Sequence, residues 1–219
     1  MSESRRLTVA LIVLTGLACF YLLYTAVLPA TRRELRSFSA YYTASSLLVG
    51  GQLGPDAYND RWFNQRLTDA TSQNIKETYS PSLPTMALLA LPLVWLPAPA
   101  AHQVWLGLHF LYLLLAVGGL ILILRRVNHG QNQPNLWLLL ATVSFLFPGV
   151  AANFYVSQTI LLFFLLFVVA LWGLVTDRAW LAGIALGLAL GLKTTGVSLW
   201  LLLLIQGRWR ALGWGLATV

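Results

Sequence analysis

Charged residues are scarce in this chain, and acidic residues are the scarcest of them. Of its 219 residues, 58% are hydrophobic, 10% are charged and only seven are Asp or Glu. Three stretches, 7–31, 78–124 and 127–176, contain no Asp, Glu, Lys or Arg. A soluble fold of this length could not bury so much apolar surface. Because about 20 apolar residues cross a bilayer, the sequence predicts an integral membrane protein.

Cysteine and the common cofactor motifs are also nearly absent. Cys19 is the single cysteine and lies in the first apolar stretch, which excludes a disulfide framework and a thiolate metal site. The sequence holds no GxGxxG, GxxxxGK[ST], HExxH, CxxC or GxSxG motif, so we expect no nucleotide cofactor. His102 and His109 face the same way on a helix, but two histidines without a third ligand are poor evidence for zinc. A need for another divalent metal stays open.

Basic residues lie at the ends of the apolar stretches. The net charge is +7, and arginines cluster at 32–33, 125–126 and 208–210. Such clusters fit anionic head groups and the setting of membrane topology. The expected partners of these residues are therefore membrane lipids, and no nucleic acid is expected.

The apolar stretches predict an all-α fold, a polytopic bundle of transmembrane helices. We expect one membrane domain over 1–219, with about six spans at 7–29, 82–97, 101–124, 136–152, 159–176 and 180–206. Prolines make the second span short and break the fourth near Pro148, so both should line a space enclosed by protein. Gly183, Gly187 and Gly191 form a smooth stripe on the last span, which lets a neighbouring helix approach closely.

The N-terminal sequence predicts the orientation of the first span. Arg5 and Arg6 should keep the N-terminus in the cytoplasm and place 32–77 outside. The run Leu7–Ala30 is longer than that of a signal peptide and no clear A-x-A site follows, which favours an uncleaved anchor. Beyond the second segment two topologies stay open. Simple alternation leaves Arg125–Arg126 outside, and a re-entrant second segment places them inside. We expect a multi-pass protein of the plasma (inner) membrane with its active face outward.

The outer loop 32–77 should contain two short helices at the membrane surface. Apolar residues between Leu35 and Val49 follow a rough helical period, which Gly50 and Gly51 end. A second short helix is indicated around Trp62 and Leu67.

The outer loop also holds most of the carboxylates. Five of the seven acids lie in it: Glu34, Asp56, Asp60, Asp69 and Glu77. A general base must be a carboxylate that reaches a substrate hydroxyl. Asp56 and Asp60 are four residues apart and share one face if the segment is helical. The alternative is that these acids are solvated and pair with nearby arginines, which contributes little energy.

Lys193 stands alone among apolar residues deep in the last predicted span. A lysine at that depth costs several kcal/mol, about 2.5 to 3.5 on insertion scales, unless it faces a cavity or an anion. A lipid phosphate is a natural partner, and snorkelling to the interface is the alternative.

Aromatic and amide side chains lie at the mouths of the predicted spans. Tyr41, Tyr42, Tyr58 and Tyr79 are either interface anchors or rings on which a sugar stacks. Gln158 interrupts an apolar segment and either bonds between helices or binds a ligand.

Several segments, in order and spacing, resemble the polytopic C-type glycosyltransferases, with family 87, the polyprenol-phosphate-mannose-dependent mannosyltransferases, as the closest match. The segments are Ser37–Ala44, Gly50-Gly51, Tyr79–Leu83, Leu91–Pro97, Ser157–Thr159, Ala182–Lys193 and Gly207–Arg210. The similarity covers most of the chain but about the first half of a typical family member. Because residues 211–219 open another apolar run too short to cross the bilayer, we expect the chain to be the N-terminal part of a larger bundle.

The resemblance implies a function. A hexosyltransferase of this kind moves a hexose, here expected to be mannose, from a polyprenyl-phosphate donor to a lipid or glycan acceptor at the outer face. A carboxylate of the first outer loop acts as general base, and basic groups, for which Lys193 and Arg36 are the candidates, receive the lipid phosphate. Tyr41, Tyr42, Tyr79 and Gln158 are the candidates for binding substrate.

One position departs from the family pattern. Where the family has an Asp-Phe pair opening the first loop helix, this chain has Ser37-Phe38. Serine is not a general base at neutral pH without activation. Either Asp60, Asp56 or Glu34 takes over, or the chain is an inactive homologue that binds polyprenyl-phosphate lipids. A transporter is a further alternative, although the two halves show no repeat.

Overall fold

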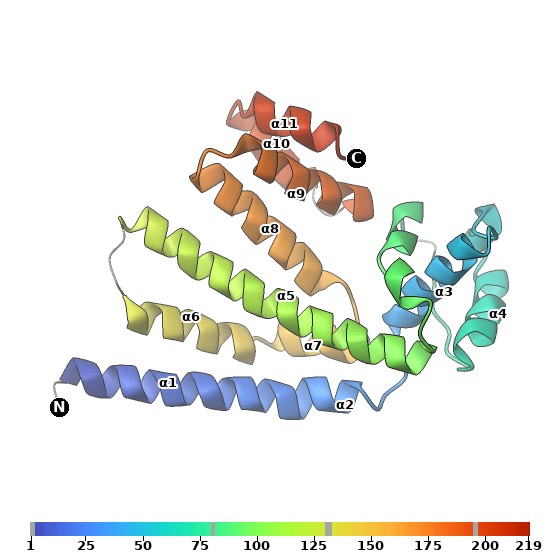
Figure 1. Cartoon of the computed structure of the whole chain (residues 1–219), viewed down its shortest axis with the longest axis horizontal. Helices are drawn as coiled ribbons and strands as arrows, with labels where there is room; N and C mark the ends of the chain where they lie inside the picture. The colour runs from blue at the N-terminus through green and yellow to red at the C-terminus, as the bar shows by residue number, and fades with distance from the viewer. Residues whose placement is uncertain (1–2, 80–81, 130–132, 195–196) are drawn as a thin grey trace.

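The computed structural model describes residues 3–79, 82–129, 133–194 and 197–219, and within them every regular element is a helix. The long helices lie side by side, and the short helices between residues 37 and 93 gather at one end of the bundle (Figure 1). The helices in chain order are α1 (Glu3–Leu22), η1 (Leu23–Val27), α2 (Leu28–Ala30), α3 (Ser37–Val49), η2 (Pro55–Tyr58), α4 (Asp60–Thr71), η3 (Pro84–Leu88), η4 (Leu91–Leu93), α5 (Ala98–Val127), α6 (Pro134–Leu146), α7 (Pro148–Val156), α8 (Ile160–Val175), α9 (Ala179–Leu192), α10 (Val197–Ile205) and α11 (Trp209–Leu216).

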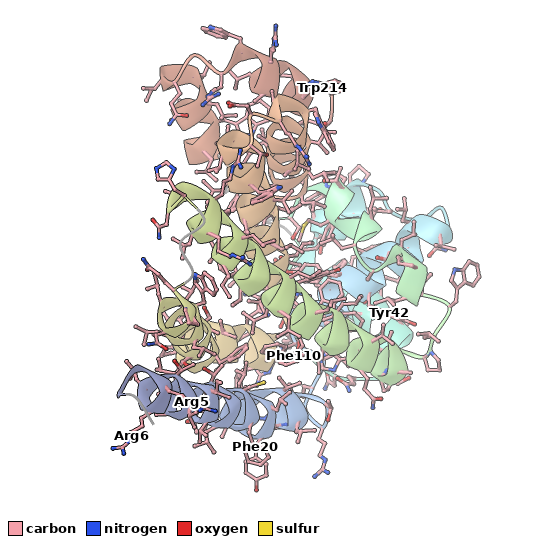
Figure 2. All side chains as sticks on the ribbon, turned by 60° about the vertical axis from the view of Figure 1, so that its left-hand side comes forward. Arg5, Arg6, Phe20, Tyr42, Phe110 and Trp214 are labelled. Carbon is pink, nitrogen blue, oxygen red and sulfur yellow. The ribbon has the colours of Figure 1, made fainter. Side chains whose placement is uncertain are left out.

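Two of the described helical segments are long and apolar enough to cross a membrane. They are Arg5–Ala30 and Ala98–Val127, and the bent pair α6–α7 makes a third if it forms one span. These segments confirm the predicted first and third spans. Phe20 is 65% exposed and points away from the neighbouring helices, as expected for a side chain that faces lipid (Figure 2).

Prolines explain two irregularities in the long helices. Pro29 has no N–H to donate, and the helix passes through a π-helical turn, Leu23–Val27, just before it. Pro148 forces Phe147 into an extended conformation, and α6 and α7 meet there at a bend of 43°. The predicted break of the fourth span is confirmed.

The predicted second span, 82–97, is wrong. This segment forms two short 3₁₀ helices, η3 and η4, of five and three residues. Pro84 and Pro92 each stand at the start of one of them, and the missing N–H groups do not support a long α-helix.

The predicted single span over 180–206 is also wrong. Lys193 adopts an extended backbone, with φ −155° and ψ 139°, and ends α9 there. The chain then returns through α10, and Arg208 pairs with Asp177 at 3.2 Å, beside the start of α9. Six spans are therefore not confirmed.

The glycine stripe of α9 packs as predicted at two of its three positions. A Cβ added at Gly183 or Gly187 would collide with backbone atoms of α11. One at Gly191 would meet nothing within 4 Å. Close backbone approach at the first two glycines is what allows α11 to lie along α9.

The two predicted helices of the outer loop are present as α3 and α4. Nine of the residues of α3 are buried, so this helix is enclosed by protein on most sides and has little surface left for lipid. Its core includes Phe38 and Tyr42, which pack with Trp105 at the start of α5. In Figure 2, Tyr42 lies where the helices of the outer loop meet α5.

Basic residues collect at the opposite end of the bundle. The Thr8 hydroxyl donates to Asn135 at 2.8 Å, and the Arg125 guanidinium lies 5.1 Å from the Trp137 ring centre, so the start of α1, the end of α5 and the start of α6 adjoin. Arg5 and Arg6 extend from this end of α1 (Figure 2). A hollow lined by Arg125, Arg126 and Val175 brings the end of α8 to the same place.

Candidate functional site

A polar cavity of about 170 Å³ lies at the end of the bundle away from Arg125 and Arg126. It is lined by residues from α3, the segment after α4, the region of η3, the α7–α8 turn and the end of α9. The lining side chains that could bind or react with a substrate include Ser37, Tyr41, Glu77, Ser82, Gln158 and Lys193. The volume is far above the roughly 10–15 Å³ that one water needs, so the cavity accepts a group of several heavy atoms.

Helix α3 places Ser37 and Tyr41 one turn apart on the cavity wall. The helix starts after Arg36, whose φ is +46° and whose carbonyl accepts hydrogen bonds from the Ser39 backbone at 2.8 Å and its hydroxyl at 2.7 Å. These bonds fix the entry of the chain into α3. Ser37, where the family resemblance predicts an aspartate, lines the cavity.

Tyr41 is held in the cavity wall by contacts on two sides. Its ring packs 5.6 Å from that of Trp105, and its hydroxyl makes a hydrogen bond with the side chain of Thr159. Burial raises the pKa of Tyr41, the hydrogen bond to Thr159 opposes the rise, and the negative charge of Glu77 adds to it. Tyr41 is therefore a neutral hydroxyl at physiological pH, placed to bond to a sugar.

Glu77 is the one carboxylate that lines the cavity among the described residues, and sequence reasoning did not select it. Its backbone N–H donates to Asn64 Oδ1 at 2.8 Å, and the hydroxyl of the next residue, Thr78, donates to Asp60 Oδ1 at 2.7 Å. The irregular segment is thus pinned to α4 on both sides of Glu77. Burial raises the pKa of Glu77, and the nearby Arg36 partly lowers it.

Two signals in the sequence could have identified Glu77. It is the last acid before the charge-free stretch that starts at 78, and it lies two residues before the Tyr79–Leu83 segment of the family resemblance.

The turn between α7 and α8 carries Gln158 into the cavity. Ser157 ends α7 with φ 58° and ψ 39°, a left-handed conformation that usually belongs to glycine. His102 Nε2 lies 2.8 Å from the Ser157 hydroxyl, and Trp105 Nε1 donates to the Ser157 carbonyl at 3.2 Å. The Gln158 N–H donates to the Asn153 carbonyl at 3.2 Å. The turn is thus fixed by α5 and α7.

Lys193 lies between the polar cavity and a second, apolar hollow. This hollow has a volume of about 360 Å³, and its wall consists of Thr159, Ile160, Phe163, Phe164, Phe167 and Lys193. Thr85 Oγ1 donates to the Gly191 carbonyl, which ties η3 to the end of α9. Lys193 makes no ion pair within the described part of the chain. Its ammonium group is therefore available to an anion.

The three carboxylates predicted as catalytic do not line the cavity. Asp56 is exposed in η2, Asp60 is exposed at the start of α4 and accepts from Thr78, and Glu34 has a 63% exposed side chain 3.6 Å from Arg36. Arg36 does not line the cavity either, but its positive charge lowers the pKa of Glu77.

The predicted tyrosines divide into two groups. Tyr41 lines the cavity, whereas Tyr42 and Tyr79 bond to backbone carbonyls, Tyr42 to Leu96 at 2.8 Å and Tyr79 to Leu83 at 3.1 Å. Burial raises the pKa of Tyr79 to about 12, so it stays a neutral donor. Tyr58 is exposed. Ser80 and Pro81, which belong to the same motif as Tyr79, lie outside the described residues.

No group of three or more His, Cys, Asp or Glu that could hold a metal occurs in the part of the chain that the structure describes. His102 bonds to Ser157, and His109 Nδ1 lies 2.9 Å from the Trp105 carbonyl.

The fold and the cavity define a helical membrane protein with a polar site at one end of its bundle. A family model described as glycosyltransferase family 87 matches residues 78–219, which includes Gln158 and Lys193. The chain belongs to glycosyltransferase family 87, and it is a membrane glycosyltransferase that acts on a sugar donor and an acceptor. No curated protein and no solved structure matches the chain.

Proposed function

We propose that this protein transfers a hexose, with mannose the first to test, from a polyprenyl-phosphate donor to a lipid or glycan acceptor at the outer face of the membrane. The observation that carries the proposal is the position of Lys193, which lines both the polar cavity and the apolar hollow. A lipid-linked sugar has three parts in that order: a polar sugar, an anionic phosphate and an apolar tail.

Each part of such a donor has a matching surface. The sugar meets Tyr41, Gln158 and Ser37 in the cavity, where hydroxyl and amide groups bond to sugar hydroxyls. The phosphate meets the Lys193 ammonium. The isoprenoid tail lies along the phenylalanines of α8, whose burial by an apolar chain is favourable.

The charge distribution supports an outer location for the cavity. Arg5, Arg6, Arg125 and Arg126 lie at the other end of the bundle, at the ends of α1 and α5, and basic residues beside span ends favour the cytoplasm, although Arg32 and Arg33 follow α2 at the cavity end. With 82–97 not a span, the re-entrant topology places the Arg125–Arg126 pair inside, in accord with this rule. Arg208, paired with Asp177, follows the same pattern.

The test is sugar transfer by the purified full-length protein in proteoliposomes. Polyprenyl-phosphate mannose and a nucleotide-linked mannose are offered in turn as donor, with a lipid acceptor. We expect transfer from the lipid-linked donor alone. Transfer from the nucleotide sugar alone would contradict the proposal.

Lys193→Ala tests the role of the ammonium group. A charge-assisted hydrogen bond contributes about 1.5–3 kcal/mol, so the KM for the lipid donor should rise roughly 10- to 100-fold, whereas Lys193→Arg should keep most of the affinity. Lys76→Ala is the matched control, because Lys76 is exposed and does not line the cavity. Equal KM values for Lys193→Ala and Lys76→Ala would show that the phosphate binds elsewhere.

Because serine at position 37 is not a general base, the alternative function is lipid binding without sugar transfer. If the chain binds polyprenyl phosphate but transfers no sugar, it is a lipid-binding homologue that has lost activity. Binding of a labelled polyprenyl phosphate, measured alongside transfer, separates the two.

A further inference from the structure

We propose that Glu77 is the general base that removes the proton from the acceptor hydroxyl, in place of the carboxylate that the family carries at the position of Ser37. The inference rests on the proposed sugar transfer. It assigns the reaction to a residue outside the segment that the family model matches and outside the acids chosen from the sequence.

Glu77 and Ser37 line the same cavity from two different segments. A carboxylate at position 77 therefore faces the same space that a carboxylate at position 37 would face. Asp56, Asp60 and Glu34 do not line it. A base must lie within hydrogen-bond reach of the proton it removes, and a carboxylate outside the cavity does not meet that condition.

Hydrogen bonds to α4 hold the segment around Glu77 in place. The Glu77 N–H donates a hydrogen bond to Asn64, and the hydroxyl of the next residue, Thr78, donates one to Asp60, so both residues are fixed to α4. A base on an irregular segment acts efficiently only if its geometry is held, and these two bonds supply that support. Asp69, by contrast, has a 60% exposed side chain that pairs with Arg66 at 3.6 Å and does not line the cavity.

Groups of both charges surround Glu77. The charged and titratable groups around Glu77 are Arg36 and Tyr41 from α3, Lys193 from the end of α9, and Asp60, which lies behind Thr78. Partial burial raises the pKa of the Glu77 carboxyl, which makes its ionised form a stronger base. The positive charge of Arg36 opposes this rise in the pKa of Glu77.

The reaction is a single displacement with balanced charge and atoms. The acceptor oxygen gives its proton to a Glu77 carboxylate oxygen and forms a bond to the anomeric carbon. The bond between that carbon and the phosphate oxygen breaks, and its electron pair leaves with the polyprenyl phosphate. The phosphate gains one negative charge beside Lys193 while Glu77 loses one. The configuration at the sugar inverts.

The experiment compares Glu77→Gln with Asp69→Asn in the full-length protein in proteoliposomes. Both variants replace a carboxylate with the isosteric amide, but only Glu77 lines the cavity. Loss of a general base lowers kcat about 100-fold or more, so we expect this loss in Glu77→Gln and an unchanged rate in Asp69→Asn. Binding of labelled polyprenyl phosphate should be the same in both.

Restoring the family carboxylate supplies a second readout. The double variant Ser37→Asp/Glu77→Gln places a new carboxylate in the same cavity, and we expect at least a tenfold recovery of kcat over Glu77→Gln. A structural role of Glu77 would give no recovery, and this result would overturn the assignment.

The remaining outcomes separate the two proposals. If the wild type transfers sugar from the lipid donor and Glu77→Gln matches Asp69→Asn, the Glu77 assignment fails and the proposed function stands. A loss of transfer in Asp56→Asn, Asp60→Asn or Glu34→Gln with Glu77→Gln active would have the same meaning. If the wild type transfers nothing from the lipid donor, both proposals fail.

Discussion

Ser157 shows at the scale of one residue how this chain departs from its family and compensates. Its left-handed backbone suits glycine, and a non-glycine residue there costs about 1–2 kcal/mol. The hydroxyl repays part of this cost through its hydrogen bond with His102. The resemblance pointed to the Gly-to-Ser change, but the backbone angle and the histidine partner depend on tertiary structure that no local pattern encodes.

Substitutions at Ser157 should reveal the two contributions separately. Ser157→Ala loses the hydrogen bond and keeps the unfavourable backbone, whereas Ser157→Gly loses the bond and relaxes the backbone. We expect Ser157→Ala to be the less stable of the two by about 1 kcal/mol. The check is the thermal midpoint of each purified variant in detergent. An alanine variant as stable as the glycine variant would argue against strain at this turn.

Arg36 should tune the pH dependence of transfer through Glu77. The base works when ionised, so kcat falls as the pH drops through the pKa of Glu77, which burial raises and Arg36 lowers. Arg36→Gln removes the lowering effect, and the acid limb of the kcat profile should move to higher pH. The matched control is Arg66→Gln, since Arg66 pairs with Asp69 at 3.6 Å, away from the cavity. A limb that stays in place or moves to lower pH would contradict this role.

At the scale of elements, hydrophobic runs predicted where helices form better than whether they cross the membrane. The runs at 7–29 and 101–124 were read correctly, because uninterrupted apolar helices of that length have one stable arrangement in a bilayer. The runs at 82–97 and 180–206 were misread. In the run 82–97, prolines limit the chain to short 3₁₀ helices. In the run 180–206, α9 ends at Lys193 and the chain reverses direction. Apolar composition alone therefore overestimated the number of spans.

The α9–α11 contact gives a prediction about elements. Gly183→Ala places a methyl group against the backbone of α11 and should lower stability, even though alanine favours helix by about 1 kcal/mol. Gly118→Ala in α5 is the control, because an added Cβ there meets nothing within 4 Å. We expect the thermal midpoint to fall in Gly183→Ala and to hold or rise in Gly118→Ala. Equal midpoints would mean that the two helices separate readily.

At the scale of the whole molecule, the sequence predicted the separation of charges but not the residues of the cavity. Arginines at span ends and acids in one loop were visible as patterns along the chain. Lys193, Tyr41 and Gln158 were selected for local reasons and do share the cavity. Glu77 was missed, because its selection needs two tertiary contacts with α4, from the Glu77 N–H to Asn64 and from the Thr78 hydroxyl to Asp60, which fix the direction of an irregular segment.

The account depends on the cavity opening on the face opposite Arg125 and Arg126, where a lipid-linked sugar would be offered. The most direct test is labelling of single cysteines by a membrane-impermeant thiol reagent in intact cells, in a Cys19→Ser background. Asp69→Cys probes the outer-loop end, and His129→Cys probes the end that holds Arg125 and Arg126; both positions are exposed. We predict that the reagent labels the cysteine at 69 in intact cells and the one at 129 only after the membrane is opened. Labelling of 129 but not 69 in intact cells would place the cavity in the cytoplasm and contradict the account.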